Sequence, residues 1–135
     1  MNKLLVIVPI WNKEQFLEKT IEGILQQTFT NFELVLVDDC STDNSLQIAK
    51  TYEHLDNVTV LTNSKNKGCY FSRNRGLDYF KDKNWDYFTI HDADDVSDVR
   101  RFQHFIDLFE SNPTVMGIKS TSMEYDSKTN EPVIK

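Results

Sequence analysis

Two nearly continuous apolar runs, separated by a stretch with helical spacing, restrict what this chain can fold into. Residues 4–8 are all Leu, Val or Ile, and residues 32–37 repeat the pattern with a single Glu. Runs of this kind are typical of strands covered on both faces, as in parallel sheets. Between them, apolar residues from 17 to 25 recur three or four positions apart and form one stripe of a helix. The chain therefore opens with a predicted strand–helix–strand unit.

The alternation of strands and helices continues along the chain. We predict further strands at 58–61, 86–91 and 115–120, and helices that include 46–52, 69–81 and 99–109. Strands that alternate with helices indicate an α/β fold with a mostly parallel sheet and right-handed crossovers. At 135 residues the chain has the size of one domain, 1–135, in which 121–135 would be a hairpin or a loose tail.

Local signals predict where several of these elements begin and end. Pro9 is expected to end the first strand. Asn12, followed three residues later by Gln15, is expected to form a capping box at the start of the first helix. The candidate N-caps of the second helix are Ser41, Thr42 and Asp43. Because ligands bind beyond the carboxyl ends of strands in such sheets, these loops are also expected to border a binding site.

Composition and charge exclude several classes of protein. With 15 basic and 21 acidic residues the net charge is −6, whereas non-specific nucleic-acid binding requires clustered Lys and Arg. The longest apolar run, residues 4–11, is far shorter than the roughly 20 residues that span a bilayer, and no secretory cleavage site follows it. Cys40 and Cys69 are too far apart for a zinc ribbon or a redox pair. We expect a cytoplasmic protein, or one held at the cytoplasmic membrane face by a partner or a further segment.

The stretch HDADD, residues 91–95, places three carboxylates directly after a predicted strand. Residues i and i+2 of an extended segment point to the same side, so Asp92 and Asp94 could face one ligand together. Carboxylate oxygens suit Mg²⁺ or Mn²⁺, which bridge to substrate phosphates. The alternative is a solvated turn in which Asp95, Ser97 or Asp98 caps the next helix. Without a positive partner, the carboxylates are expected to repel one another until a cation arrives with the ligand.

Other polar side chains near strand ends could complete a site. Asp39 ends the stretch VLVDD and could accept hydrogen bonds from a nucleobase. Arg73 could meet a diphosphate or the face of a base, whereas Arg75 is interpreted as a solvated helix charge. We interpret His91 as a hydrogen-bonded packing residue rather than a catalytic base. The sequence has neither a GxGxxG turn nor a P-loop, so a phosphorylated ligand would need a divalent cation.

Four motifs, LLVIVPIWN, FELVLVDDCSTDNS, NKGCYFSRNRGLDYF and FTIHDADD, follow one another in the expected strand and helix contexts. Together they resemble the nucleotide-sugar-binding half of a family 2 glycosyltransferase, and the resemblance covers residues 3 to about 120. It implies the GT-A fold, a three-layer α/β/α, Rossmann-like arrangement truncated at its C-terminal side. The chain would then be the donor-binding part of a longer enzyme, or a short natural homologue.

The resemblance implies that a nucleoside-diphosphate sugar, most often a UDP-sugar, lies across the carboxyl edge of the sheet. Pro9 and Asn12 would line the nucleoside pocket. Asp39 would bind the base, and Arg73 would lie near the base or the diphosphate. The implied enzyme transfers a hexosyl or N-acetylhexosaminyl group, with inversion, to a hydroxyl of an unidentified glycan, protein or lipid-linked acceptor.

The resemblance also implies a divalent metal, Mn²⁺ or Mg²⁺. Asp94 would ligate the metal, Asp92 would contact the ribose or a metal-bound water, and Asp95 is the alternative ligand. An inverting enzyme also needs a general base, commonly in a Glu-Asp pair, and this sequence contains no Glu-Asp dipeptide. The catalytic residue is therefore unidentified, and we expect it outside this chain. A further departure is His91, which takes a position that is usually apolar in the family.

Two other interpretations stay open at this stage. The chain could be a nucleotide-sugar-binding module without turnover, which would be stabilised by UDP and Mn²⁺ in the same way. It could also be a phosphoacceptor receiver domain, because such domains carry an acidic pair after one strand and another Asp after a later strand. In receivers, however, the acidic pair should follow the first strand, and here it follows the second.

Overall fold

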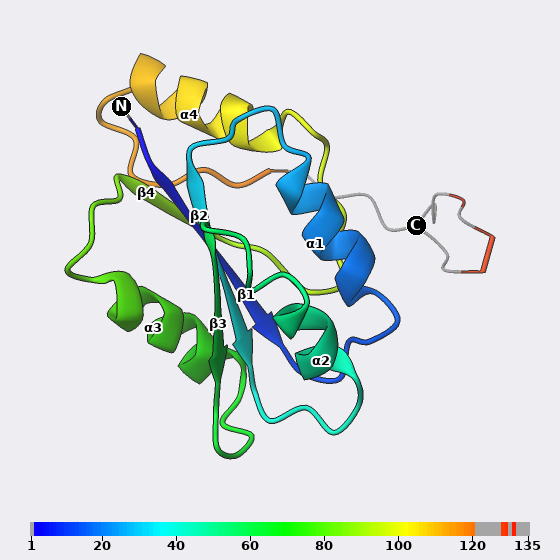
Figure 1. Cartoon of the computed structure of the whole chain (residues 1–135). Helices are drawn as coiled ribbons and strands as arrows, with labels where there is room; N and C mark the ends of the chain where they lie inside the picture. Colours follow the sequence, from blue (N-terminus) through cyan, green and yellow to red (C-terminus); the bar gives the residue numbers. More distant parts are fainter. Residues whose placement is uncertain (1, 121–127, 130, 132–135) are drawn as a thin grey trace.

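The computed structural model describes residues 2–120, 128–129 and 131, and its central feature is a four-stranded parallel sheet (Figure 1). The order of the strands across the sheet is β3-β2-β1-β4. The elements are β1 (Leu4–Ile10), α1 (Leu17–Leu25), β2 (Phe32–Asp38), α2 (Ser45–Lys50), β3 (Val58–Thr62), α3 (Cys69–Phe80), β4 (Tyr87–Ile90) and α4 (Arg101–Ser111). The predicted α/β fold with a parallel sheet is confirmed.

Helices cover both faces of the sheet, and this explains the uninterrupted apolar runs. Alternate residues of β1 point to opposite faces, so Leu4 and Val6 belong to one buried cluster and Leu5 and Ile7 to another. The first cluster packs against α1, α2 and α4, and the second packs against α3. The expected three-layer arrangement is present. Within the described residues, no helix has both the length and the apolar content needed to cross a membrane.

The chain reverses direction across the sheet after β3. The first two crossovers, through α1 and α2, step from β1 to β2 to β3, whereas α3 returns the chain along the opposite face to β4, beside β1. A right-handed crossover that runs in the opposite direction must use the opposite face, which is why α3 stands apart from α1 and α2. The order therefore reverses between β1 and β4, and sheets of this class bind ligands at that point, beyond the carboxyl ends of the strands.

Pro9 does not end the first strand, because β1 continues through Pro9 to Ile10. Pairing between β1 and β4 stops at Ile7 and Ile90, and the last bond on this side runs from His91 N to Ile7 O, at 2.9 Å. Since alternate residues of a strand hydrogen-bond to the same neighbour, Pro9 faces the β4 side, where no partner remains. Its missing N–H therefore removes no ladder bond.

The fifth strand predicted at 115–120 is absent, since these residues form neither strand nor helix. The side chain of Met116 is 98% exposed and Val115 is also exposed, so the short apolar run covers no sheet edge. An apolar run becomes a strand only where a neighbouring strand satisfies its backbone, and periodicity alone cannot reveal that partner. The expected hairpin or tail at 121–135 lies outside the described residues, apart from 128–129 and 131.

Gly76 leaves room for Ile7 of the sheet to pack against α3. A Cβ atom added to Gly76 would lie 2.8 Å from Cγ2 of the fully buried Ile7. We expect Gly76→Ala to lower the free energy of unfolding by about 1–3 kcal/mol, because overpacking displaces the strand or the helix. Chemical denaturation monitored by circular dichroism measures this change.

Gly23→Ala is the matched control, because the nearest atom to its added Cβ would be Val96 Cγ1, at an ordinary 3.8 Å. Alanine is favoured over glycine inside a helix by about 1 kcal/mol, so this variant should be as stable as the wild type or more stable. Equal destabilisation by both changes would contradict the packing of Gly76 against Ile7.

Candidate functional site

An open cleft of 320 Å³ lies at the carboxyl edge of the sheet, where the strand order reverses. Its walls come from the loops after β1, β2 and β4 and from the first turns of α3. The residues that line the cleft are Pro9, Ile10, Trp11, Lys13, Asp39, Cys69, Ser72, Arg73, Asp92, Ala93 and Asp94. Of the residues predicted for the site, Pro9, Asp39, Arg73, Asp92 and Asp94 meet here, whereas Asn12 and Asp95 do not line the cleft.

Asn12 joins two loops instead of lining the cleft or capping a helix. Its backbone is left-handed, with φ 49°, a conformation that asparagine tolerates better than most residues. Its side-chain oxygen accepts a hydrogen bond of 2.8 Å from the backbone N–H of Thr42. The backbone N–H of Asn12 donates to Ser41 Oγ at 3.0 Å. The predicted capping box is wrong, because α1 begins only at Leu17 and has no side-chain cap.

Asp39 is held by donors from the segment that leads into α3. The residue is 3% exposed, and its carboxylate accepts hydrogen bonds of 2.8 Å each from Asn63 Nδ2 and from the backbone N–H groups of Lys67 and Gly68. Burial alone would raise the pKa of Asp39, but these hydrogen bonds outweigh it and lower the pKa below 3.8. Asp39 is therefore ionised at neutral pH and organises one wall of the cleft.

Gly68 is the residue that lets this wall approach Asp39 so closely. Its φ of 89° and ψ of 163° lie in a region of backbone conformation that only glycine adopts readily.

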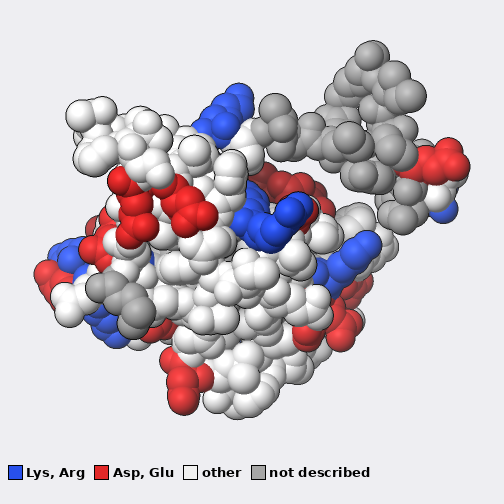
Figure 2. Space-filling view, turned by 90° about the horizontal axis from the view of Figure 1, so that it is seen from above, with Lys and Arg blue, Asp and Glu red and all other residues white. Residues whose placement is uncertain are grey.

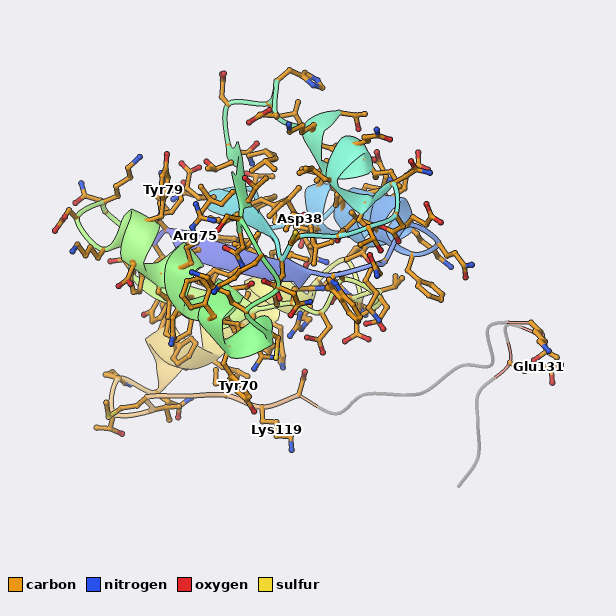
Figure 3. All side chains as sticks on the ribbon, turned by 90° about the horizontal axis from the view of Figure 1, so that it is seen from below. Asp38, Tyr70, Arg75, Tyr79, Lys119 and Glu131 are labelled. Atoms are coloured by element: carbon orange, nitrogen blue, oxygen red, sulfur yellow. The ribbon has the colours of Figure 1, made fainter. Side chains whose placement is uncertain are left out.

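The turn after β2 passes through Cys40, whose backbone is left-handed, with φ 60°. In Figure 3, Asp38, the last residue of β2, lies near the middle of the molecule between α2 and α3. Asp38 and Asp39 thus bond different segments, since Asp38 Oδ2 accepts from the backbone N–H of Ser41, whereas Asp39 accepts from the segment that leads into α3.

The two arginines of α3 have different surroundings. Arg73 lines the cleft with Nη2 3.7 Å from Asp92 Oδ1, and its Nε is buried without a hydrogen-bond partner among the described residues. The prediction that Arg75 is a solvated charge is wrong, because its Nη1 donates to Asn63 Oδ1 at 2.7 Å and also to the carbonyl of Thr62. Arg75 therefore supports the residue that binds Asp39, and Figure 3 shows it on α3 with Tyr79.

The acidic stretch after β4 already has positive partners within the chain. Lys13 Nζ lies 2.9 Å from Asp94 Oδ2, and Arg73 lies beside Asp92. The expectation that only an arriving ligand would balance these charges is therefore wrong. Both pairs are partly solvent-exposed, so each contributes little to stability, typically less than about 1 kcal/mol.

Asp95 differs from Asp92 and Asp94 because it forms no ion pair among the described residues. Burial, followed by the negative charges of Asp92 and Asp94, raises its pKa above 3.8. The predicted role of this stretch as a helix cap is met only in part, because the N-cap position of α4 is Arg100 and has no side-chain cap. Asp98 nevertheless accepts a 2.8 Å bond from the backbone N–H of Arg100.

The backbone of the acidic stretch is held by α1. Thr20 is buried, and its Oγ1 lies 2.9 Å from the carbonyl oxygens of both Ala93 and Asp95. Gln27, also buried, donates through Nε2 to the carbonyl of Asp98 at 2.8 Å. Sequence reasoning missed both residues, because Thr20 occupies an ordinary polar position of an amphipathic helix and Gln27 lies in the loop that follows it. They fix the turn from which Asp92 and Asp94 project.

His91 is a buried packing residue with both ring nitrogens bonded, as predicted. It is 2% exposed, with Nδ1 2.9 Å from the carbonyl oxygen of Asp92 and Nε2 2.8 Å from Ser97 Oγ. Burial lowers the pKa of His91 below 6.5, although the bond to Asp92 and nearby carboxylates oppose this. The imidazole does not line the cleft.

The stability of the fold should fall as the pH drops below 6.5, because of His91. Above pH 6.5 the imidazole is neutral in both states, whereas between 6.5 and the lowered folded pKa only the unfolded chain takes up the proton. Each unit by which folding lowers the pKa of His91 reduces the free energy of unfolding by about 1.4 kcal/mol across this pH range. Denaturant unfolding at several pH values between about 5 and 7.5 should show this slope in the wild type but not in His91→Asn.

His104→Gln supplies the control for this pH dependence, because His104 is exposed. Asp95 contributes to the pH dependence of stability with the opposite sign, because its raised pKa stabilises the fold as the pH falls. The wild type, His91→Asn and His104→Gln all retain Asp95. Identical slopes in the wild type and His91→Asn would contradict a neutral, buried His91.

The face of the molecule drawn in Figure 2 does not have the clustered Lys and Arg that non-specific nucleic-acid binding requires. On the face shown in Figure 2, acidic and basic side chains are interspersed and no continuous basic patch is present.

No group of three or more His, Cys, Asp or Glu side chains within the described part of the chain could hold a metal ion alone. Asp92 and Asp94 could therefore supply only part of a coordination shell, and the ligand would have to supply the rest.

Comparisons with known proteins agree with this geometry. The family model described as "Glycosyl transferase family 2" matches residues 5–132. Among curated proteins, the chain is 44% identical over 63 residues to the glycosyltransferase GlyG of Streptococcus pneumoniae, a match that covers 47% of this chain. The chain spans only 21% of the length of GlyG.

Two solved structures share the architecture. TarS of S. aureus, in complex with UDP-GlcNAc, superimposes with a TM-score of 0.74 and 26% identity, over 93% of this chain and 38% of that one. The mannosyltransferase PcManGT from Pyrobaculum calidifontis, in complex with GDP-Man and Mn²⁺, has a TM-score of 0.72 and 25% identity, over 83% of this chain and 33% of that one. The parallel α/β domain thus has the GT-A fold that the sequence implied.

Proposed function

The chain belongs to glycosyl transferase family 2, and from this premise we propose that it binds a UDP-sugar in the cleft and takes part in metal-dependent transfer of the sugar. The observation that carries the proposal is the convergence of Asp39, Arg73, Asp92 and Asp94 on one cleft at the switch point of the sheet. A receiver domain is disfavoured, since the acidic pair follows β2 and the matched family is one of glycosyltransferases.

The nucleoside end of the donor would lie toward Asp39. Of its two oxygens, Oδ1 already accepts two hydrogen bonds and Oδ2 accepts one, so Oδ2 retains a lone pair for an N–H of the base. Pro9 would form the floor of this part of the cleft, and Arg73 would face the base or the diphosphate. For Asn12 we propose an indirect role, in which it fixes the turn that carries Trp11 and Lys13. UDP-GlcNAc bound to TarS supports UDP as the nucleotide.

The residues present could hold a divalent cation if the donor supplied further ligands. Asp94 and Asp92 offer hard oxygen ligands on one wall, and Mn²⁺ or Mg²⁺ commonly completes its shell with water and phosphate oxygens. When bound, the metal acts as a Lewis acid on the leaving diphosphate. Thr20 of α1 holds the backbone on either side of Asp94, while Asp95 would be the alternative ligand. The Mn²⁺ in the PcManGT complex supports this part of the proposal.

The transferred group would be a hexosyl or N-acetylhexosaminyl residue, and the acceptor a hydroxyl of a glycan, a protein or a lipid-linked molecule. We propose inversion at the anomeric carbon, and we assign no general base to this chain. The free thiols of Cys40 and Cys69, both exposed, suit a reducing compartment, and we place the activity in the cytoplasm or at the cytoplasmic membrane face. The competing proposal is a donor-binding module without turnover.

Release of sugar from UDP-GlcNAc, with Mn²⁺ present, separates these two proposals. Wild-type chain that releases sugar faster than Asp94→Ala would support catalysis, because that variant lacks the metal ligand but keeps the rest of the cleft. Equal rates, together with UDP binding by the wild type, would favour the module without turnover. If UDP does not bind the wild type at all, the proposed function fails.

A further inference from the structure

We propose that His91 is a positioning residue, whose Nδ1–H holds the main-chain carbonyl of Asp92 and thereby fixes the direction in which the Asp92 carboxylate enters the cleft. The proposal rests on the nucleotide-sugar function proposed above, to which it adds a residue outside the cleft wall. His91 is buried directly behind the acidic stretch, at the end of β4. It acts through Asp92 and touches no ligand itself.

The hydrogen-bond partners of His91 determine which of its nitrogens carries the proton. The carbonyl oxygen of Asp92, 2.9 Å from Nδ1, can only accept, so Nδ1 must donate. On the other side of the ring, Ser97 Oγ lies 2.8 Å from Nε2 and also accepts a bond of 3.1 Å from Arg101 Nη1. A guanidinium only donates, so the single hydroxyl proton of Ser97 is free to point at Nε2. Arg101 therefore donates to Ser97, Ser97 donates to His91, and His91 donates to the carbonyl of Asp92.

This chain of hydrogen bonds joins three elements behind the acidic stretch. Arg101 is the first residue of α4, Ser97 lies in the loop, and His91 follows β4. Thr20 holds the carbonyls of Ala93 and Asp95 from α1, but it does not reach Asp92. Besides His91, the Asp92 carbonyl accepts only a longer bond of 3.2 Å from the backbone N–H of Asp95, among the described residues. Among the described residues, His91 is thus the side chain that restrains the main chain of Asp92, whereas Arg73 pairs with its carboxylate.

A buried imidazole could serve packing alone, and two substitutions distinguish that role from positioning. In His91→Asn the side-chain amide can replace Nδ1–H and keep the bond to the Asp92 carbonyl. In His91→Gln the amide at the end of the longer side chain can replace Nε2 as the partner of Ser97. This side chain cannot also reach the Asp92 carbonyl, so that bond is lost. The variants share polarity and differ in which bond survives, so a merely structural role predicts the same binding for both.

The first test is the ¹⁵N NMR spectrum of the His91 imidazole in the labelled chain at pH 7.5. We expect a protonated, pyrrole-like Nδ1 and an unprotonated, pyridine-like Nε2. A proton on Nε2 with an unprotonated Nδ1 would overturn the proposal, because Nδ1 could not then donate to Asp92. This NMR measurement requires neither nucleotide nor metal.

The second test compares UDP binding by calorimetry in the presence of Mn²⁺. We expect His91→Asn to bind within about threefold of the wild type and His91→Gln to bind at least about tenfold more weakly, the range in which supporting residues of metal sites act. Thermal denaturation checks that both variants fold. Equal affinities for the two folded variants would overturn the positioning role. If the wild type binds no UDP, the proposed function fails, and the imidazole spectrum alone decides the hydrogen-bond assignment.

Discussion

An Asp39→Ala variant is expected to be less stable than the wild type by about 2–4 kcal/mol and to bind UDP at least tenfold more weakly. Three donors converge on this buried carboxylate, from Asn63, Lys67 and Gly68, and hydrogen bonds to a charged group contribute about 1.5–3 kcal/mol each. The variant leaves these donors unpaired and frees the wall that leads into α3. Denaturant unfolding and calorimetric titration with UDP and Mn²⁺ measure the two effects.

Asp38→Asn is the matched control for this variant. Asp38 is equally buried, but only its Oδ2 accepts a hydrogen bond, from the backbone N–H of Ser41, while Oδ1 has no partner among the described residues. Asparagine can keep that one bond, so stability should change by less than about 1 kcal/mol and UDP binding should be unchanged. A loss of UDP binding in Asp38→Asn as large as in Asp39→Ala would contradict the assignment of the base site to Asp39.

Replacing Asp94 with alanine is expected to weaken Mn²⁺-dependent UDP binding by at least about tenfold, because the main proposed metal ligand is removed. The fold should tolerate the change, since the Asp94 side chain is partly exposed and its partner Lys13 can turn to solvent. Calorimetry of UDP with and without Mn²⁺ gives the metal-dependent part of the affinity. Affinity that stays metal-dependent in Asp94→Ala would place the metal on another ligand.

Lys13→Met provides the opposite change at the same site. The ammonium group of Lys13 lies 2.9 Å from Asp94 Oδ2, so a metal that binds Asp94 would have to displace it. We expect Lys13→Met to bind Mn²⁺ alone roughly two- to fivefold more tightly, the range set by the free energy of a partly exposed ion pair. Mn²⁺ binding followed by electron paramagnetic resonance, in the absence of nucleotide, measures this directly.

Most of the fold could be predicted from the sequence, because both faces of the sheet are covered. A strand buried on two faces has an unbroken apolar run, and the runs at β1 and β2 are the clearest features of this chain. Residues 115–120 show where that reasoning stops. Their short apolar run looks the same as a strand, but a strand also needs a neighbour, and the sequence does not reveal which edge is free.

The carboxylates of the site could be predicted, but not every residue that holds them in place. Asp39, Asp92 and Asp94 follow strands, and parallel topology brings strand ends together at one edge. Lys13 also follows a strand, so its nearness to the acidic stretch could have been anticipated from the same rule. Thr20 could not, since nothing in the spacing of an amphipathic helix shows that one polar residue turns toward a distant loop.

Asn12 shows why local motifs fail near a functional site. Its spacing from Gln15 matches a capping box, but its side chain instead binds the backbone of the loop after β2. The helix then starts five residues later without a side-chain cap. The contacts between the loops after β1 and β2 override the local signal here.

Thermal unfolding of the chain alone, with UDP, with Mn²⁺, and with both together tests the central claim most directly. A ligand that binds only the folded state at 100 times its dissociation constant stabilises it by about 2.7 kcal/mol, which corresponds to a shift on the order of 10 °C. We predict a shift of this size with both ligands, larger than the sum of the two separate shifts, because metal and diphosphate complete each other's binding at Asp92 and Asp94. Melting temperatures that are the same in all four samples would contradict nucleotide and metal binding in this cleft.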